Sequence, residues 1–188
     1  MAPSIQILHV HYRGKKLSIL DSDDSTPIYT VQIPSQGMKL SLSPSISWTH
    51  KPYSPTSQEP SKPTKPIATA TFAALSTSVT VTIHSLQLTL QREKTFNRSY
   101  IFTNANGTAL RWENDGMLSG DWKLVDVKSN AVQARFRNKV FSSSELGTFE
   151  VMGCEEEERD LVVVSGLAVL VMVQSTVLAA LVLAGGED

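Results

Sequence analysis

The sequence predicts a mainly-β protein, a sandwich or a barrel, completed by one long apolar C-terminal helix. Roughly ten to twelve short segments alternate apolar and polar residues, and turn signals separate them about every eight to twelve residues, as in sandwiches and barrels. The stretch 161–184 contains no charged residue. As a helix it would span about 36 Å, at about 1.5 Å per residue. Such a segment has to be buried, either by a sheet that surrounds it or by a lipid bilayer.

Length and composition indicate an ordinary globular protein. The 188 residues are enough for one domain with a sizeable core, which we expect to cover 1–188. The formal net charge of −1 gives no reason to expect a nucleic-acid partner. Cys154 is the one cysteine, so no internal disulfide can form, which favours a reducing compartment. The first residues include neither a basic segment nor a long apolar one, so we expect no signal peptide and a cytoplasmic protein.

The N-terminal part of the chain reads as strands joined by polar turns. Arg13–Lys15 is a plausible turn between the first two strands. Asp21–Asp24 is expected to be a solvated turn, because Thr26 and Gln32 stand where a calcium loop of the EF-hand type needs Gly and Glu. The strands predicted here lie within 4–20 (two strands) and at 28–33, 38–42 and 46–48.

The segment 51–66 differs from its surroundings because it contains five prolines and almost no apolar residue. Proline cannot donate a backbone hydrogen bond, and the segment has little to bury, so it cannot belong to a sheet. We expect an extended loop inserted into the domain. Its prolines match the P-x-x-P spacing of polyproline ligands, so the loop could contact a protein partner, but the match is weak and a plain linker explains the composition better.

The second half carries the clearest alternation. From 78 to 83 the odd-numbered residues are apolar, whereas from 86 to 91 the even-numbered ones are. A pattern of period two cannot change parity in this way without an extra residue, so we predict a bulge or a tight bend at His84–Ser85. Asn106–Gly107 is a hairpin turn signal. Further strands are predicted at 99–103, 108–112, 122–127, 131–137 and 148–152.

The helix is predicted to begin at about Asp160. This side chain can cap a helix, and Glu155–Glu158 before it complement the positive end of the helix dipole. The half 161–173 is about 20 Å long and apolar on all sides, so a water-soluble fold would have to surround it. If 161–184 instead crosses a bilayer, the chain is a tail-anchored membrane protein with a cytosolic β domain. Its flanks, however, lack the basic and aromatic residues usual at membrane boundaries.

Several segments, taken in order, carry a resemblance to a known family. They lie at 27–31, at 99–102 leading into 107–112, and at 122–126, 132–136 and 160–168. In this order the chain resembles the tubby C-terminal-like superfamily, with its LURP-one-related and phospholipid-scramblase-like proteins, and most of all its short, uncharacterised fungal members. The resemblance implies a closed antiparallel barrel of about twelve strands threaded by a hydrophobic C-terminal helix. The loop 51–66 and the apolar stretch beyond Val173 depart from the family's pattern.

Three basic side chains are the predicted candidates for ligand contact. Arg135, Arg137 and Lys139 lie opposite the apolar positions of their strand, with Lys123 expected near them, so they should point outward together. Such a group can contact phosphoinositide or other anionic lipid headgroups, and a solvated strand face is the alternative. The tubby-like resemblance includes phosphoinositide binders, but it carries over no headgroup-binding residue onto this chain.

No residue pattern predicts catalysis, a cofactor or a metal ion. His9 and His11 share a strand face and could form a metal pair, but no cysteine or carboxylate near them in the sequence has ligand spacing, so ordinary strand histidines are expected. The sequence holds no nucleophile elbow, glycine-rich phosphate loop or HExxH. We therefore expect a non-enzymatic intracellular module, and its resemblance to tubby-like proteins implies that it binds an anionic membrane lipid or a protein partner. The alternative is the tail-anchored protein with 161–184 as its transmembrane helix.

Overall fold

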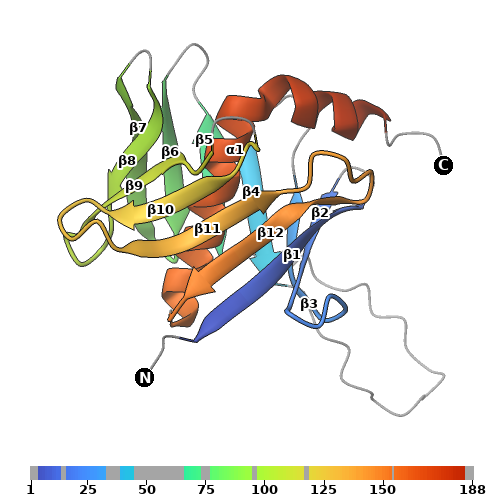
Figure 1. The fold of residues 1–188 in the computed structure, drawn as a ribbon, viewed down its shortest axis with the longest axis horizontal. Helices are drawn as coiled ribbons and strands as arrows, with labels where there is room; N and C mark the ends of the chain where they lie inside the picture. The colour runs from blue at the N-terminus through green and yellow to red at the C-terminus, as the bar shows by residue number, and fades with distance from the viewer. Residues whose placement is uncertain are drawn as a thin grey trace.

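Twelve antiparallel strands form a closed barrel in the computed structural model, and one helix, α1, runs through it (Figure 1). The closed barrel and its C-terminal helix confirm the predicted fold class. The structure describes residues 4–13, 16–32, 39–44, 66–72, 77–94, 97–116, 119–153 and 155–184. The side chains of Arg13, Lys94, Asn97 and residues 174–184 lie outside that description.

Each strand pairs with the next one along the chain, and β12 pairs with β1 to close the ring. A closed ring leaves no strand with an unpaired edge. The strands are β1 (Ile5–Arg13), β2 (Lys16–Leu20), β3 (Pro27–Gln32), β4 (Lys39–Pro44), β5 (Ala68–Phe72), β6 (Ser78–Ile83), β7 (Leu86–Lys94), β8 (Asn97–Thr103), β9 (Ala109–Asn114), β10 (Trp122–Asp126), β11 (Val132–Asn138) and β12 (Glu145–Met152).

A two-residue turn at His84–Ser85 explains the change of parity between β6 and β7. Ile83 pairs directly with Leu86, and the two residues between them have positive φ angles of 48° and 96°. Paired residues point to the same side of a sheet, so a two-residue turn carries the inward side from odd to even positions. The prediction of a tight bend is therefore confirmed, and its alternative, a bulge, is not needed.

The helix α1 (Glu156–Ala184) begins before Asp160. The backbone N–H of Arg159 already donates to the carbonyl of Glu155, at 3.0 Å. The prediction that Asp160 caps the helix was therefore wrong. Asp160 is only 3% exposed, and its carboxylate accepts hydrogen bonds from Tyr29 of β3 and from His84 of the β6–β7 turn. The physical reason is that Glu156–Glu158 are exposed, so the acidic first turn lies in solvent and the helix enters the barrel one turn later.

Inside the barrel α1 is surrounded by the sheet. Every residue from Val162 to Leu170 is buried, as expected of a helix that is apolar on all sides. The helix contacts β5, β6 and β12, and its C-terminal part lies outside the barrel (Figure 1). Within the described portion of the chain, no helix combines the length and the apolarity that crossing a membrane requires.

The core is closely packed around Phe149 of β12. Its ring centroid lies 4.9 Å from that of Phe136 and 6.4 Å from that of Trp112. The indole N–H of Trp112 donates to the Ser165 hydroxyl of α1 at 3.0 Å, and this hydroxyl donates to the carbonyl of Val162 at 3.3 Å. Among the described residues, every buried side-chain nitrogen and oxygen has a hydrogen-bond partner, so burying them costs little net free energy.

Other predictions agree with the structure less completely. The strand β5 was not predicted, and β12 begins three residues earlier than expected, at Glu145 rather than at 148. In β5 the buried residues include Ala68 and Ala70, on a strand that α1 contacts. Small side chains leave room for the helix but weaken the apolar alternation in the sequence. The predicted strand 46–48, most of the proline-rich loop, Trp48 and Cys154 lie outside the described residues.

Candidate functional site

The predicted basic side chains lie on the outside of β11, as expected. Arg135 and Arg137 alternate with the buried Ala134 and Phe136, and Lys139 follows where the strand ends. Lys123 of β10 is paired in register with Arg135, which places it next to them as predicted. Alternation along β11 places Arg135 and Arg137 on the exterior face, and its pairing with β10 places Lys123 beside them.

Each of these cations lies beside a carboxylate. Arg135 Nε is 3.3 Å from Asp115 Oδ2, and Arg137 Nη1 is 3.1 Å from the same oxygen. Arg137 also reaches Asp121 at 3.4 Å and Glu150 at 3.5 Å. Burial lowers the pKa of Arg137, but the three carboxylates together raise it by more than burial lowers it. The pKa of Arg137 is therefore above its usual value. The face is therefore an ion-pair network, in which a lipid phosphate has to compete with protein carboxylates.

The loop 139–144, between β11 and β12, carries an exposed apolar pair. Val140 is 61% exposed and Phe141 is 103% exposed, and we call them the Val140–Phe141 tip. Backbone hydrogen bonds hold the loop: the N–H of Ser142 donates to the carbonyl of Lys139 and the N–H of Lys139 to that of Leu146, both at 3.0 Å. The loop that carries the tip joins β11 to β12 at the end of the barrel from which α1 emerges (Figure 1). Single exposed apolar side chains are common, but two that adjoin at the end of one loop form a small contiguous apolar patch, which can serve as a contact surface.

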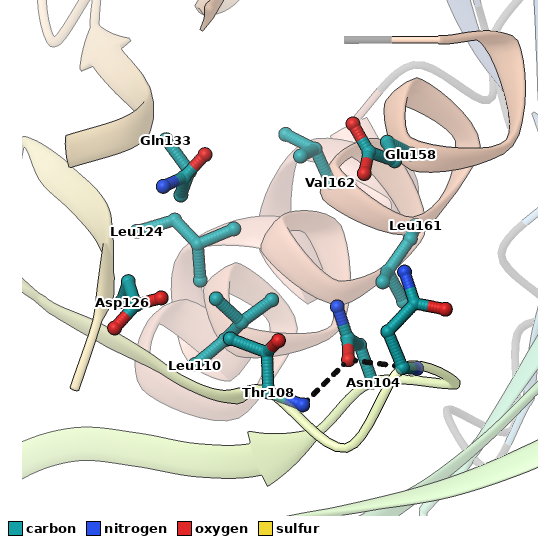
Figure 2. Close-up of a pocket in the computed structure, with 10 residues that line it drawn as sticks. Asn104, Thr108, Leu110, Leu124, Asp126, Gln133, Glu158, Leu161 and Val162 are labelled. Atoms are coloured by element: carbon teal, nitrogen blue, oxygen red, sulfur yellow. Dashed lines mark hydrogen bonds between the residues drawn. The ribbon is translucent and has the colours of Figure 1, made fainter. Parts of the chain in front are cut away.

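At the opposite end, where α1 enters, a pocket opens beside the helix (Figure 2). Two of its polar side chains, Asn104 and Asp126, accept hydrogen bonds from the backbone. The Asn104 side-chain oxygen accepts hydrogen bonds from the N–H groups of Asn106 at 3.0 Å and Thr108 at 2.9 Å (Figure 2). Its two acids are Asp126 and Glu158. Hydrogen bonds from the backbone N–H groups of residues 129 and 128 hold the pKa of Asp126 below its usual value. A pocket with this acidic rim does not suit an anionic ligand.

A buried hydrogen-bond network at the same end joins α1 to the sheet. The Tyr29 hydroxyl donates to Asp160, and His84 Nε2 lies 2.9 Å from the other Asp160 oxygen. Arg159 Nε donates to the Tyr29 hydroxyl at 2.8 Å, and its guanidinium carbon lies 5.6 Å from the centroid of the Tyr29 ring. Burial and the Asp160 carboxylate raise the pKa of Tyr29, with Arg159 opposing part of the rise. The network attaches the start of α1 to β3 and to the β6–β7 turn.

The structure also assembles a cluster around the two N-terminal histidines. His9 Nδ1 lies 3.1 Å from Glu145 Oε1, and His11 Nε2 lies 2.7 Å from Asp24 Oδ1. Sequence analysis singled out the histidines but missed both carboxylates. Glu145 is 136 residues from His9 along the chain, and the closing pair of strands, β1 and β12, brings them together. Asp24 was interpreted as part of a solvated turn. That turn, between β2 and β3, does exist but folds back toward β1.

Comparison with known proteins supports the architecture alone. No family model matches the chain, and no curated protein matches it in sequence. Among solved structures, the X-ray structure of a protein from Arabidopsis thaliana is similar, with a TM-score of 0.57. The two sequences are 14% identical over 90% of each chain. At this identity the likeness shows a shared fold and says nothing of a shared ligand or activity.

Proposed function

We propose that the chain is a non-enzymatic tubby-like module, related to the LURP-one type, that docks peripherally on an anionic membrane through the Val140–Phe141 tip. The barrel with a buried C-terminal helix, and its likeness to the Arabidopsis structure, are compatible with this relationship. The observation that carries the membrane proposal is the complete exposure of Phe141 beside Val140 and Lys139.

The chemistry of the tip suits the interface of a bilayer. A valine or phenylalanine side chain moved fully from water to an apolar medium contributes about 1.5–3 kcal/mol. Lys139 stands next to the pair, and a lysine stem can lie along apolar surface while its ammonium stays among headgroups. In the structure this ammonium lies 2.5 Å from Glu145 Oε2. A headgroup phosphate would therefore compete with Glu145 for the ammonium. Two apolar side chains and one shared cation imply weak, reversible attachment.

The ion pairs of β11, the strand before the tip, determine how strongly the protein is attracted to anionic headgroups. Arg135 and Arg137 both contact Asp115, which reduces their attraction for phosphate. The proposal therefore assigns membrane contact first to the tip and only second to the arginines. The non-enzymatic part of the proposal is supported by the Tyr29 network, in which the hydroxyl donates to Asp160, and by the pocket's Asn104, whose side-chain oxygen accepts from the backbone.

Vesicle sedimentation tests the proposal. The full chain is expected to pellet with vesicles of phosphatidylcholine and phosphatidylserine, and less with phosphatidylcholine alone. The double variant Val140→Ser with Phe141→Ser should lose most of this binding and keep its thermal stability, because both side chains are exposed. Asp115→Asn should strengthen binding to the anionic vesicles, since it frees Arg135 and Arg137 from one carboxylate.

Val127→Ser is the matched control, because Val127 is an exposed apolar side chain, 38% accessible, at the opposite end of the barrel. It should bind vesicles like the unmodified chain. Equal binding by the tip variant would overturn the proposal. Absence of vesicle binding, together with self-association that the tip variant abolishes, would reassign the tip to a protein contact.

A further inference from the structure

Four potential metal ligands meet on the outside of the barrel, where β1 and β12 close the ring. Alternation along β1 puts His9 and His11 on the same exterior face, and their rings stack with centroids 6.3 Å apart. One ligand atom from each of His9, His11 and Glu145 lies within 4.8 Å of the other two. The Glu145 residue is only 8% exposed, so this carboxylate is unusually well buried for a group on the outside of a barrel.

Asp24 completes the group from the β2–β3 turn. Its Oδ1 lies 2.7 Å from His11 Nε2 and 3.6 Å from His9 Nδ1. The turn is well defined: the Asp21 N–H donates to the carbonyl of Thr26 and the Asp24 N–H to the carbonyl of Asp21, both at 2.8 Å. Asp24 itself adopts a positive φ of 52°, a conformation that aspartate tolerates in turns.

The distances fit a small ion with few ligands. Ligand atoms bound to one tetrahedral zinc ion at about 2.0–2.1 Å lie about 3.4 Å from one another. The separations from His9 Nδ1 to Glu145 Oε1, 3.1 Å, and to Asp24 Oδ1, 3.6 Å, lie on either side of that value. His11 Nε2 and Asp24 Oδ1, which lie 2.7 Å apart, would have to move apart, and the three ligand atoms of His9, His11 and Glu145, which lie within 4.8 Å of one another, would have to close on the ion.

The surroundings also have the arrangement of a metal site. Lys139 binds Glu145 Oε2, which fixes the carboxylate and leaves Oε1 facing His9. Hydrogen bonds that orient a ligand from behind are usual at metal sites. Two carboxylates and one lysine leave a net charge of about −1 beside two neutral imidazoles, which favours the binding of a cation.

We propose that His9, His11 and Glu145, with Asp24 as the fourth ligand, bind one divalent transition-metal ion of the Zn²⁺ type. Imidazole and carboxylate ligands together suit zinc, cobalt and nickel rather than calcium or magnesium, which prefer oxygen alone. The ion would join β1, β12 and the β2–β3 turn, and so clamp the closure of the ring. Because binding requires the folded arrangement, the metal would stabilise the folded barrel.

Titration of the purified, chelator-treated full chain with Zn²⁺, followed by calorimetry, tests the proposal directly. One ion per chain and a rise of the melting temperature are expected. Co²⁺ should give the intense visible absorption of a tetrahedral site. His9→Ala, His11→Ala and Glu145→Gln should each weaken binding at least tenfold, and Asp24→Asn should weaken it less, since it alone lies in a turn.

Two controls keep the result specific. His84→Asn removes a histidine of another part of the barrel, and Cys154→Ser removes the thiol; neither should change Zn²⁺ binding. Unchanged affinity in His9→Ala and His11→Ala, with both variants folded by circular dichroism, would overturn the proposal. So would an equal loss in His84→Asn, or the absence of Zn²⁺ binding by the unmodified chain. Vesicle binding is measured on the same variants, so failure of the metal site is distinguishable from failure of the membrane tip.

Discussion

At the scale of single residues, Gly166 shows how tightly α1 fits the barrel. A Cβ atom added at this position would lie 2.6 Å from Phe149 Cε1 and 3.0 Å from Trp112 Cζ2. Neither ring can give way easily, because Phe149 also packs against Phe136 at a centroid distance of 4.9 Å. The glycine therefore sets the distance between the helix and the aromatic side chains of β9 and β12.

Replacing Gly166 with alanine has two opposing effects on the stability of the fold. Alanine favours a helix interior over glycine by about 1 kcal/mol, whereas overpacking of a core costs about 1–3 kcal/mol. We expect the second effect to prevail and the melting temperature to fall. Chemical denaturation of Gly166→Ala beside the unmodified chain measures it, and a more stable variant would show that the aromatic rings can move.

The sequence pattern predicted that the two histidines share a strand face, but it could not predict which carboxylates lie beside them. His9 and His11 stand two apart, so alternation alone places them on one face. Glu145 and Asp24 have no such spacing, and only ring closure and the folded turn bring them near. For the same reason the outward direction of Arg135 and Arg137 was predictable, whereas their pairing with Asp115 and Asp121 was not, because these acids stand beyond β9 and before β10.

At the scale of elements, the start of α1 is held by Tyr29 and Asp160. The helix pattern predicted a cap at Asp160, since a short acidic side chain before an apolar run is typical of one. Burial within the barrel mouth is a tertiary effect that local sequence does not encode, and it made Asp160 an acceptor for Tyr29 and His84 instead. The strand β5 was missed for a related reason: its alanines make space for α1 and so carry little apolar signal.

Tyr29→Phe tests this attachment and its dependence on pH. Removing the hydroxyl leaves Asp160 with one donor fewer, so we expect the free energy of unfolding at pH 7 to fall by about 1–3 kcal/mol. The pKa of Tyr29 is raised in the folded state, first by burial and then by Asp160. Above about pH 10, the usual tyrosine pKa, the unfolded chain loses this proton while the folded chain keeps it, so stability falls as pH rises.

In the Tyr29→Phe variant this alkaline loss of stability should be shallower. It should not vanish, because burial also raises the pKa of Tyr12 and Tyr100. Denaturation at a series of pH values between neutrality and strong alkali gives both slopes. Identical slopes in the two proteins would show that Tyr29 ionises equally readily in the folded and unfolded chains.

At the scale of the whole molecule, the helix is the core of the barrel. The sheet turns apolar side chains inward from all its strands, and Val162–Leu170 cover them. The apolar alternation of the strands and the uncharged C-terminal stretch were enough to predict the fold class, a β-sheet protein with one apolar helix. Sequence alone left open whether a sheet or a bilayer buries the helix, because both offer it an apolar surrounding.

Truncation measures the dependence of the sheet on its helix. A chain ending at Glu158 should aggregate, because it exposes the apolar lining of the barrel to water. A chain ending at Val173 keeps all the buried positions of α1 described here and should remain soluble and cooperatively folded. Gel filtration and thermal melting of both, beside the full chain, separate the two cases. A folded, soluble chain ending at Glu158 would contradict the assignment of α1 to the core.

The sequential order of the strands also governs how fast the barrel can form. Of the twelve pairings described, all but β1 with β12 join strands that follow one another in the chain. Most of these hairpins close short loops, which costs little chain entropy and takes microseconds. The exception is the pair β4 and β5, because residues 45–67 lie between them. Pairing β1 with β12 instead closes a loop that contains nearly the whole barrel. Until that step the sheet is an open ribbon with two free edges, so the rate of folding is governed by the meeting of the two ends around the helix.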